Sequence, residues 1–233
     1  IPSKMMIAAA DRVREIREAD RFGISAEITG IDFKRIMREM KEAVVPDHQQ
    51  IHQALQEDER FDYYEGLGRF VDDRTLEVNG RRIKGDTIFI ASGARPRIPE
   101  IKGLDGVDYL TSDTVLDLTA CPKSLAIIGG GYIASEYGHF FSAMGADVTI
   151  LQRHQRLVPA EEPAVSQLLA AELQKRLRIE FNTAVTHVSG NKDNFTVSYT
   201  RSGSGEQQQL EAEQVLVAVG RQSNADRLDV AST

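Results

Sequence analysis

The stretch Ser124-Leu125-Ala126-Ile127-Ile128-Gly129-Gly130-Gly131-Tyr132-Ile133-Ala134 decides the fold of this chain. Its first five residues are an apolar run of the length of a buried strand, and the spacing Gly-x-Gly-x-x-Ala begins directly after it, at Gly129. A helix to about Met144 and a second strand over 147–151 are expected to follow. Strand, glycine turn, helix and strand predict a βαβ unit and therefore an α/β fold.

The glycine spacing predicts a dinucleotide site built from residues 129–134. Gly129 allows a tight turn, Gly131 lets a pyrophosphate approach the backbone, and Ala134 lets the helix pack closely on the strand. The start of the helix supplies free N–H groups and a partial positive charge to the phosphates. The predicted cofactor-binding residues here are Gly129, Gly130, Gly131, Tyr132, Ile133 and Ala134. The alternative is a glycine-rich turn that holds no ligand.

The end of the second strand should read the ribose of the adenosine. Sites for NAD usually place Asp or Glu there, but this chain has Gln152, followed by Arg153 and Arg156. Two arginines could clamp a 2′-phosphate through charge-assisted bonds, so the sequence favours NADP over NAD. The alternative is that both arginines are solvated and that Gln152 merely tolerates NADH.

Composition narrows the possible functions. The chain has 233 residues, a formal charge of −7, and 41% hydrophobic residues, which indicates a globular protein and argues against binding nucleic acid by bulk phosphate neutralisation. It has a single cysteine, Cys121, and five histidines without the HExxH spacing, so we predict no metal site. No apolar run reaches the length of a membrane span, and no signal peptide is recognised. We expect a cytoplasmic protein that neither enters a membrane nor binds nucleic acid.

The remaining pattern predicts helices in the first third of the chain and short strands after it. The expected helices are 3–22, a second that begins near Asp32 and is kinked or ended by Pro46, and 163–177, with Val165, Leu168, Leu169 and Leu173 inward. The expected strands are 64–71, 75–78, 81–83, 87–91, 180–188, 194–199 and 215–219. Asn79-Gly80 is typical of a type I′ hairpin.

One internal similarity bears on the number of domains. Residues 88–93 and 215–220 share a pattern in which an apolar strand ends in Ala-x-Gly. The similarity suggests two related nucleotide-binding domains, although strands of this kind are common in any α/β protein. We place the boundary in the connector, with one domain over residues 1–112 and a second over 113–233.

Four stretches together resemble the class I pyridine nucleotide–disulfide oxidoreductases, the family of dihydrolipoamide dehydrogenase, mercuric reductase and glutathione reductase. They are Ile1-Pro2-Ser3-Lys4, Ala91-Ser92-Gly93-Ala94-Arg95-Pro96, residues 129–136, and Gly220-Arg221-Gln222-Ser223-Asn224. One departure is Ser223, where the family usually has proline. The resemblance covers essentially the whole chain.

The resemblance implies two Rossmann-like domains, the first for FAD and incomplete, the second for NAD(P), with three-stranded β-meander insertions. It also implies that the ADP-binding βαβ unit of the FAD domain and a redox cysteine pair precede Ile1, and that a dimerisation domain follows Thr233. On this basis the chain is expected to be a central fragment, inactive alone, of a homodimeric enzyme.

The resemblance further assigns roles to individual residues. Lys4 matches the lysine near the flavin and Glu136 the glutamate that pairs with it; both are expected to be catalytic and to contact the cofactor. Without the resemblance, two surface charges on separate helices would be the simpler reading. Other expected cofactor contacts are Gly68, Ser92, Gly93 and Ala94 for FAD, Tyr132 on the nicotinamide side of the flavin, and Val185 and Gly220 for NAD(P).

The implied activity is hydride transfer between NAD(P)H and FAD, followed by electron transfer through the cysteine pair to an acceptor. The chain most resembles dihydrolipoamide dehydrogenase, and an NADPH-dependent mercuric reductase or a glutathione reductase-like enzyme is the alternative. The expected partner is therefore a small disulfide, a lipoyl group or a metal ion. A different class remains open, a non-redox NAD(P)-binding module, as does a flavoenzyme of the same fold that uses no disulfide.

Overall fold

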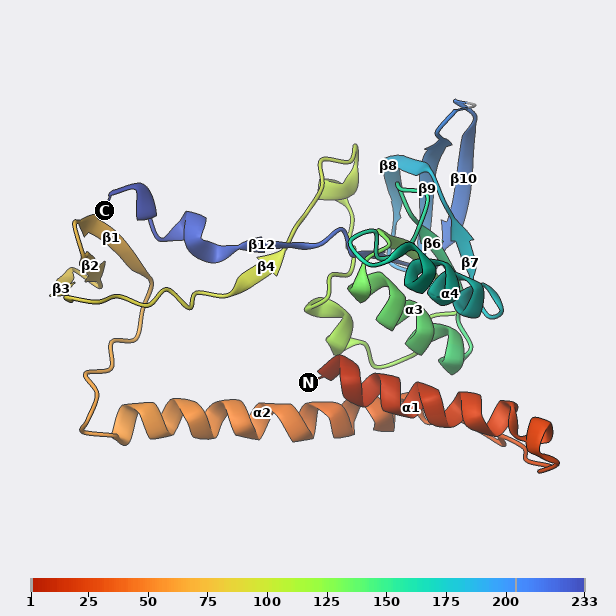
Figure 1. Ribbon diagram of the computed structural model, residues 1–233, viewed down its shortest axis with the longest axis horizontal. Helices are drawn as coiled ribbons and strands as arrows, with labels where there is room; N and C mark the ends of the chain where they lie inside the picture. The colour runs from red at the N-terminus through yellow and green to blue at the C-terminus, as the bar shows by residue number, and fades with distance from the viewer. Residues whose placement is uncertain (1, 204, 233) are drawn as a thin grey trace. The chain divides into compact units, whose positions relative to one another are not determined.

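The computed structural model describes residues 2–203 and 205–232 (Figure 1). Ile1, the first residue of the Ile-Pro-Ser-Lys motif, lies outside the described residues. The chain forms two compact units, which interleave along the sequence. The first comprises Ile1–Val44 and Pro96–Gly220, and the second comprises Val45–Arg95 and Arg221–Thr233. The predicted domain boundary at residue 113 falls inside the first unit and stays a prediction.

A parallel four-stranded sheet forms the centre of the first unit. Its strands lie in the order β11 (Gln214–Val217), β5 (Ser124–Ile128), β6 (Asp147–Leu151) and β7 (Arg178–Glu180). The register pairs Ile127 with Ile150 across β5 and β6. Helix α3 (Tyr132–Met144) connects these two strands, so the predicted βαβ unit is confirmed.

Alternate residues of β5 serve two hydrophobic layers. Leu125 and Ile127 pack into a core with α1 (Pro2–Arg17), α3 and α4 (Pro163–Gln174). Ala126 and Ile128 pack into a second core on the other face of the sheet. Because side chains alternate along a strand, one apolar run supports both layers.

The second core is covered by an antiparallel meander. Its strands are β8 (Thr183–Asn191), β9 (Asn194–Arg201) and β10 (Gln207–Ala212), with β9 in the middle. This meander and the one in the second unit confirm the predicted β-meander insertions. The sequence had predicted only two of these three strands, and β10 was missed.

Helix α1 lies beside α3 (Figure 1). Met6, Ala10 and Val13 form its buried face, and they are three to four residues apart, as on one side of a helix. The helix ends at Arg17, five residues before the predicted end at residue 22, and a 3-10 turn over Ala19–Phe22 follows. Gly23 ends this turn with a φ of 73°, in the left-handed region that glycine adopts easily.

Helix α2 (Phe33–Glu57) begins at the predicted cap. Asp32 Oδ1 accepts a hydrogen bond from the backbone N–H of Arg35 at 2.9 Å. The helix continues through Pro46 to Glu57 and does not end at the proline, although an interior proline removes one backbone bond and crowds the preceding turn. In the first unit Phe33 packs on Phe140, with ring centroids 5.8 Å apart.

The predicted inward face of α4 is partly wrong. Leu173 is buried and Leu169 is half-buried, but the side chains of Val165 and Leu168 are 53% and 65% exposed. Ser166 and Ala170 are buried instead of these two. The hydroxyl of Ser166 is satisfied in its buried position, because it donates to the carbonyl of Val158 at 3.3 Å.

The second unit contains an antiparallel sheet of β1 (Gly68–Asp72), β2 (Thr75–Val78) and β3 (Arg81–Lys84). Asn79 and Gly80 both have positive φ, 50° and 78°, which confirms the predicted type I′ turn. The strand predicted over 87–91 is not formed, because no strand in the described part of the chain runs beside this segment. Phe89 is 90% exposed there. Next along the chain, β4 (Ala94–Pro96) pairs with β12 (Arg221–Ser223).

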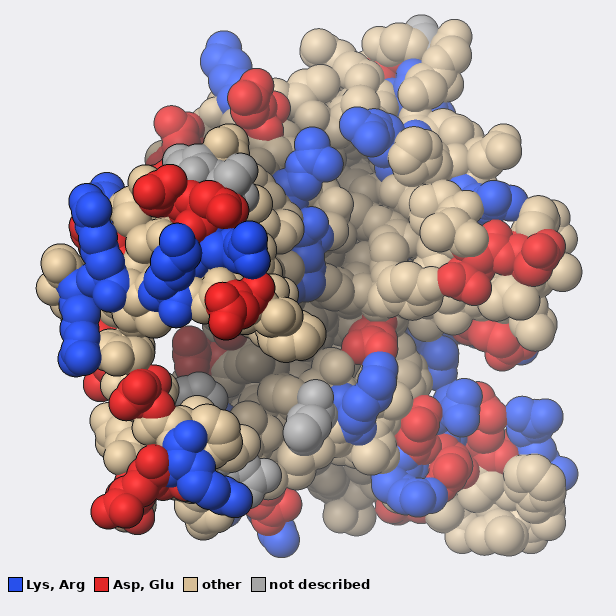
Figure 2. All heavy atoms as spheres, turned by 60° about the vertical axis from the view of Figure 1, so that its left-hand side comes forward, with Lys and Arg blue, Asp and Glu red and all other residues tan. Residues whose placement is uncertain are grey.

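Acidic and basic side chains are interspersed over the face drawn in Figure 2. Several ion pairs of the described residues lie within or at the end of one helix, as between Arg35 and Glu39 at 2.7 Å and between Lys175 and Glu172 at 2.6 Å. Among the described residues, no helix is both long and apolar enough to span a bilayer.

Candidate dinucleotide site

The glycine turn is held tightly from both sides. The backbone N–H of Gly129 donates to the carbonyl of Leu151 at 3.0 Å, and the carbonyl of Gly130 accepts from Val158 N–H at 2.7 Å. Gly129 has a φ of 122°, and a Cβ there would lie 2.3 Å from the carbonyl oxygen of Ala218. Glycine is therefore required at residue 129 by the fold itself.

Gly131 differs from the two glycines before it. A Cβ on this residue would have no heavy atom within 4 Å, so the fold does not need a glycine here. Gly131 is the residue at the N-cap of α3, and it makes no side-chain hydrogen bond to the N–H groups of this helix start. An open, uncapped helix start that follows a parallel strand fits the pyrophosphate of a dinucleotide.

Gln152 is buried beneath the glycine turn and does not project from the end of β6. Its side chain is 4% exposed, and Nε2 donates to the carbonyl of Arg156 at 2.8 Å. Its backbone is also fixed, because Thr183 N–H donates to the Gln152 carbonyl at 3.0 Å. The structure therefore gives Gln152 a structural position, and its predicted contact with the ribose stays a prediction.

The predicted arginine clamp consists of two unlike residues. Arg153 is exposed at the end of β6, whereas the guanidinium of Arg156 donates from Nη2 to the carbonyl of Pro159 at 2.8 Å. Of the pair, Arg153 is thus the better placed to meet a ligand in solution. Arg156 ties together the segment 152–161, which forms the rim of the site.

Two residues of this rim were not predicted from the sequence. Val158 is buried at a φ of 38°, an uncommon conformation for a β-branched residue, and its N–H holds Gly130. Glu161 accepts a hydrogen bond from the hydroxyl of Tyr132, the first residue of α3. That bond raises the pKa of the tyrosine above its ordinary value. Nothing in the local pattern distinguishes Val158 or Glu161 from ordinary loop residues.

Lys4 and Glu136 form an ion pair between α1 and α3. The Lys4 side chain is 68% exposed and that of Glu136 is 27% exposed. Glu136 lies one turn into α3, so the pair stands beside the same helix start as Gly131. The structure thus joins the two residues that the resemblance paired, although their role toward a flavin stays a prediction.

Three predicted flavin contacts lie together in the second unit, at residues 92–94. Asn224 donates to the carbonyl of Ser92 through Nδ2 at 2.9 Å and to the carbonyl of Gly93 through its backbone N–H at 3.0 Å. Gly93 has a φ of 67°, and a Cβ there would meet no heavy atom within 4 Å. The segment therefore presents an open backbone that a ligand could approach.

A second ion pair anchors the partner strand of this segment. Arg95 forms two hydrogen bonds to the carboxylate of Asp226, at 2.8 and 2.6 Å. The hydrogen bonds from Arg95 lower the pKa of Asp226 to about 2. Neither residue was predicted as a site residue. Arg95 lies within the stretch 91–96, and Asp226 follows the stretch 220–224, on which the family resemblance rests.

The last three predicted contacts are spread over both units. Gly68 begins β1 in the second unit, opposite Val78. In the first unit, Val185 lies in β8 at a bulge, and Gly220 follows β11 with a φ of 117° and open space around its Cα. Because a Cβ on Gly220 would meet no heavy atom, a ligand could approach its backbone. The roles of Gly220, Gly68 and Val185 stay predictions.

The sole cysteine is poorly suited to redox chemistry. Burial raises the pKa of the Cys121 thiol to about 11, so the reactive thiolate is scarce at neutral pH. Its Sγ lies 3.6 Å from the carbonyl oxygen of Pro122. This environment disfavours a redox role for Cys121.

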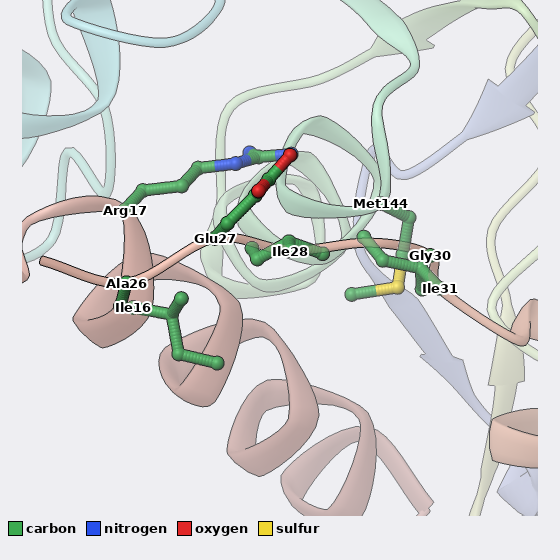
Figure 3. Close-up of a pocket in the computed structure, with 8 residues that line it drawn as sticks. All are labelled: Ile16, Arg17, Ala26, Glu27, Ile28, Gly30, Ile31 and Met144. Atoms are coloured by element: carbon green, nitrogen blue, oxygen red, sulfur yellow. The ribbon is translucent and has the colours of Figure 1, made fainter.

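A groove of about 680 Å³ lies at the far end of α3 (Figure 3). Its lining residues are Ile16, Arg17, Ala26, Glu27, Ile28, Gly30, Ile31 and Met144. Met144 ends the helix that Gly131 caps, so this groove and the glycine turn lie at opposite ends of α3. The groove is therefore separate from the candidate dinucleotide site.

Comparison with known proteins finds relatives along the whole chain. The family model described as pyridine nucleotide-disulphide oxidoreductase matches residues 1–232. The chain is 34% identical over its whole length to a mercuric reductase of Staphylococcus aureus and covers 42% of that protein. It is 32% identical to a dihydrolipoyl dehydrogenase of Geobacillus stearothermophilus, where the match spans 98% of the chain and 49% of the relative.

A solved structure gives the same result. The Cu(II) complex of the HOCl-induced flavoprotein disulfide reductase RclA from Escherichia coli superposes with a TM-score of 0.80 at 26% identity, over all of this chain and 49% of that one. The chain thus spans about half the length of the relatives that it matches. The α/β fold with Rossmann-like and meander elements is confirmed by this likeness.

Proposed function

Because the chain belongs to the pyridine nucleotide-disulphide oxidoreductase family, we propose that it carries the NAD(P)H-binding and part of the flavin-binding machinery of an FAD-dependent oxidoreductase. One observation supports this proposal above the others. The uncapped start of α3, open at Gly131, stands beside the Lys4–Glu136 ion pair in the same unit.

The start of α3 would bind the pyrophosphate. Its N–H groups and the partial positive charge of the helix favour an anion, and the bare Cα of Gly131 lets that anion approach the backbone. Gly129 and Gly130 hold the turn in position through their backbone bonds to Leu151 of β6 and to Val158 of the rim. Binding at this end of the helix orients the nicotinamide along the carboxyl edge of the sheet.

Arg153 would recognise the adenosine end of the cofactor. It is exposed at the end of β6, where a 2′-phosphate would lie, and no carboxylate occupies residue 152. We therefore propose NADPH as the preferred reductant. Arg156 contributes indirectly, because its bond to Pro159 shapes the rim.

Lys4 and Glu136 would lie on the flavin side of the nicotinamide. Bound FAD supplies the two-electron carrier between the nicotinamide and the acceptor. In the pair, the carboxylate of Glu136 would hold the Lys4 ammonium group in position, so that its N–H groups could bond to the cofactor. Residues 92–94 would contact FAD through their backbone, as the open space at Gly93 allows.

The acceptor is proposed to be a disulfide such as a lipoyl group, with mercuric ion as the second candidate. The similarity to the dihydrolipoyl dehydrogenase and the Ile-Pro-Ser-Lys motif support the first. The similarity to the mercuric reductase and the absence of a carboxylate at Gln152 support the second. Either acceptor would draw electrons through a dithiol that Cys121 does not supply.

The proposal is tested with the native protein that carries this chain. It should contain FAD, and NADPH added without oxygen should bleach the flavin absorbance. Oxidised lipoamide and Hg²⁺ with excess thiol are then compared as acceptors by NADPH consumption. A protein that binds NADPH but contains no flavin would be a non-redox nucleotide-binding module, and that outcome would contradict the proposal.

A further inference from the structure

Two polar side-chain pairs join α1 to α3, and the acidic residue is on α3 in one pair and on α1 in the other. In the first, Lys4 of α1 meets Glu136 of α3. In the second, Asp11 of α1 meets His139 of α3, with Oδ1 and Nε2 3.0 Å apart. The basic group is on α1 in the first pair, and the acid is on α1 in the second. If α1 were shifted so that the pairs exchanged partners, Asp11 would lie against Glu136, and the repulsion between two carboxylates opposes that arrangement.

The second pair is the more deeply buried. The side chain of His139 is 13% exposed and that of Asp11 is 38% exposed. Nδ1 of His139 has no hydrogen-bond partner among the described residues, although it is buried. A buried imidazole with only one bonded nitrogen is unusual, since such groups are normally satisfied.

Charged groups from three segments surround this imidazole. Arg14 of α1 lies 3.7 Å from Asp11, and Arg176 follows α4 with a buried Nε that also lacks a partner among the described residues. Burial is the largest of the effects that lower the pKa of His139. Arg176 and Arg14 lower it further, whereas Asp11 raises it. Glu172 and Glu18 face Arg176 and partly offset its charge.

The neutral form of His139 suits these surroundings best. When Nε2–H donates to Asp11, Nδ1 is an acceptor in the same cluster as the unpartnered donor Nε of Arg176. Protonation would turn Nδ1 into a second buried donor and would add a third positive charge beside Arg14 and Arg176. Acid is therefore expected to weaken this contact between α1 and α3.

We propose that Asp11 and His139 are a positioning pair, which fixes α1 on α3 so that Lys4 stays against Glu136 only while His139 is neutral. Lys4 and Asp11 are two helical turns apart on α1, so a shift of α1 at Asp11 moves Lys4 with it. Met6 and Ala10, which lie between them, are buried and carry no polar group that specifies the register.

The inference predicts an acid-sensitive stability. The pKa of His139 is lower in the folded state than in the unfolded state, where it is about 6.5. The unfolded chain then binds more protons below that pH. The contribution is present above about pH 6.5 and is lost as the pH falls toward the folded pKa. The unfolding equilibrium constant should rise about tenfold for each unit between the two pKa values.

The first experiment measures denaturant unfolding of the native protein between pH 8 and pH 5. His139→Gln keeps a neutral polar side chain but cannot titrate, and His187→Gln, in β8 on the other face of the sheet, is the matched control. We expect His139→Gln alone to remove the acid-dependent loss of stability. An unchanged pH profile in His139→Gln would overturn the proposal. If that variant does not fold, ¹H–¹⁵N titration of His139 in the native protein decides, and a folded pKa at or above 6.5 would overturn it.

The second experiment tests positioning and rests on the proposed function, because it reads Lys4 and Glu136 through the flavin. The absorbance spectrum of the FAD-bound protein is recorded over the same pH range. We expect a spectral shift with the same midpoint as the stability change, absent in His139→Gln and retained in His187→Gln. A stability change without the spectral shift would make the pair merely structural and would overturn the positioning role. A protein without flavin would contradict the proposed function, while the first experiment would still decide whether His139 senses pH.

Discussion

The side chain of Gln152 packs directly against Gly130, because a Cβ on that glycine would be 2.4 Å from Cδ of the glutamine. Two residues from opposite ends of the βαβ unit are therefore fitted to each other. Glycine at residue 130 creates the space in which Gln152 is buried, and the buried Gln152 leaves Arg153 as the first exposed residue after β6.

The three glycines should separate folding from binding. Gly129→Ala meets both the positive φ and the carbonyl of Ala218, so it should lower the free energy of unfolding by about 2 kcal/mol or more. The Cβ of Gly131→Ala would contact no heavy atom, so this change should lower the free energy of unfolding by less than about 1 kcal/mol. It should nevertheless weaken NAD(P)H binding about tenfold or more, equivalent to about 1.4 kcal/mol. Denaturant titration and fluorescence titration measure the two effects. Equal binding by wild type and Gly131→Ala would contradict the site.

Arg153 should set the preference for NADPH. Charge-assisted hydrogen bonds to the 2′-phosphate are worth about 1.5–3 kcal/mol, so Arg153→Ala should reduce kcat/KM for NADPH by at least about tenfold. The value for NADH should hardly change. Arg178→Ala, at the start of β7 and hence at the opposite edge of the sheet, is the control. A wild type that already prefers NADH would show that Arg153 is a solvated charge.

Changing Gln152 should affect the fold more than the choice of cofactor. A glutamate there would bury a charge next to the carbonyl of Arg156, which Gln152 now bonds, and an unpaired buried carboxylate is costly. We therefore expect Gln152→Glu to be destabilised, with a melting temperature that rises again when acid protonates the new carboxyl group. Gain of NADH activity without loss of stability would show that residue 152 faces the ribose.

Glu161 should restrain Tyr132 and oppose the cofactor. Its carboxylate accepts the tyrosine hydroxyl and raises the pKa of Tyr132. Glu161→Gln should lower that pKa toward its ordinary value, as alkaline titration of phenol absorbance would show. Removing a negative charge from the rim should also tighten NADPH binding slightly, by about 0.5 kcal/mol or roughly twofold. Weaker binding by Glu161→Gln would instead indicate that Glu161 contacts the cofactor.

Asp226 should titrate at unusually low pH. Hydrogen bonds from Arg95 lower its pKa to about 2, compared with about 3.9 for an unfolded aspartate. The pair therefore stabilises the second unit above about pH 4 and loses this effect as the pH falls toward 2. Carboxyl chemical shifts in NMR measure the pKa directly. In Arg95→Gln the pKa should return to the ordinary range, and a pKa that stays low would assign the shift to another neighbour.

Cys121 should be nearly inert toward thiol reagents. A pKa raised from 9.0 to about 11 reduces the thiolate fraction at neutral pH about a hundredfold. Iodoacetamide should thus modify the native protein far more slowly than the protein in urea. Similar rates in both states would show that the native thiol is accessible and ionised.

The βαβ unit could be predicted because local and tertiary signals agree there. The apolar run of β5 and the glycine spacing after it both favour a strand followed by a helix, and the predicted βαβ unit was confirmed. In contrast, β10 was missed because Gln207-Gln208-Gln209 has no apolar alternation that would indicate a strand. Its pairing with β9 depends on backbone register and on contacts such as the hydrogen bond from the Tyr199 hydroxyl to Gln208. Residues 87–91 have strong propensity but no neighbouring strand, and the strand does not form.

Some residues of the candidate site could be predicted from local sequence, and others could not. Gly129 and Gly131 stand in a recognisable local spacing, so the sequence placed them at the turn. Glu161 and the pair of Asp11 with His139 depend on contacts across 29 and 128 residues. A single sequence contains no pattern for such contacts, and only the folded chain brings these residues together.

The two-sided strand β5 also bears on how this unit folds. A slip of one residue in its pairing with β6 would turn Leu125 and Ile127 toward the meander and Ala126 and Ile128 toward the helices. Both hydrophobic layers would then be packed incorrectly. A slipped strand therefore cannot keep one of the two layers in its native packing. The helical layer and the meander should therefore form in a single cooperative transition, and hydrogen exchange should protect the amides of both to the same degree.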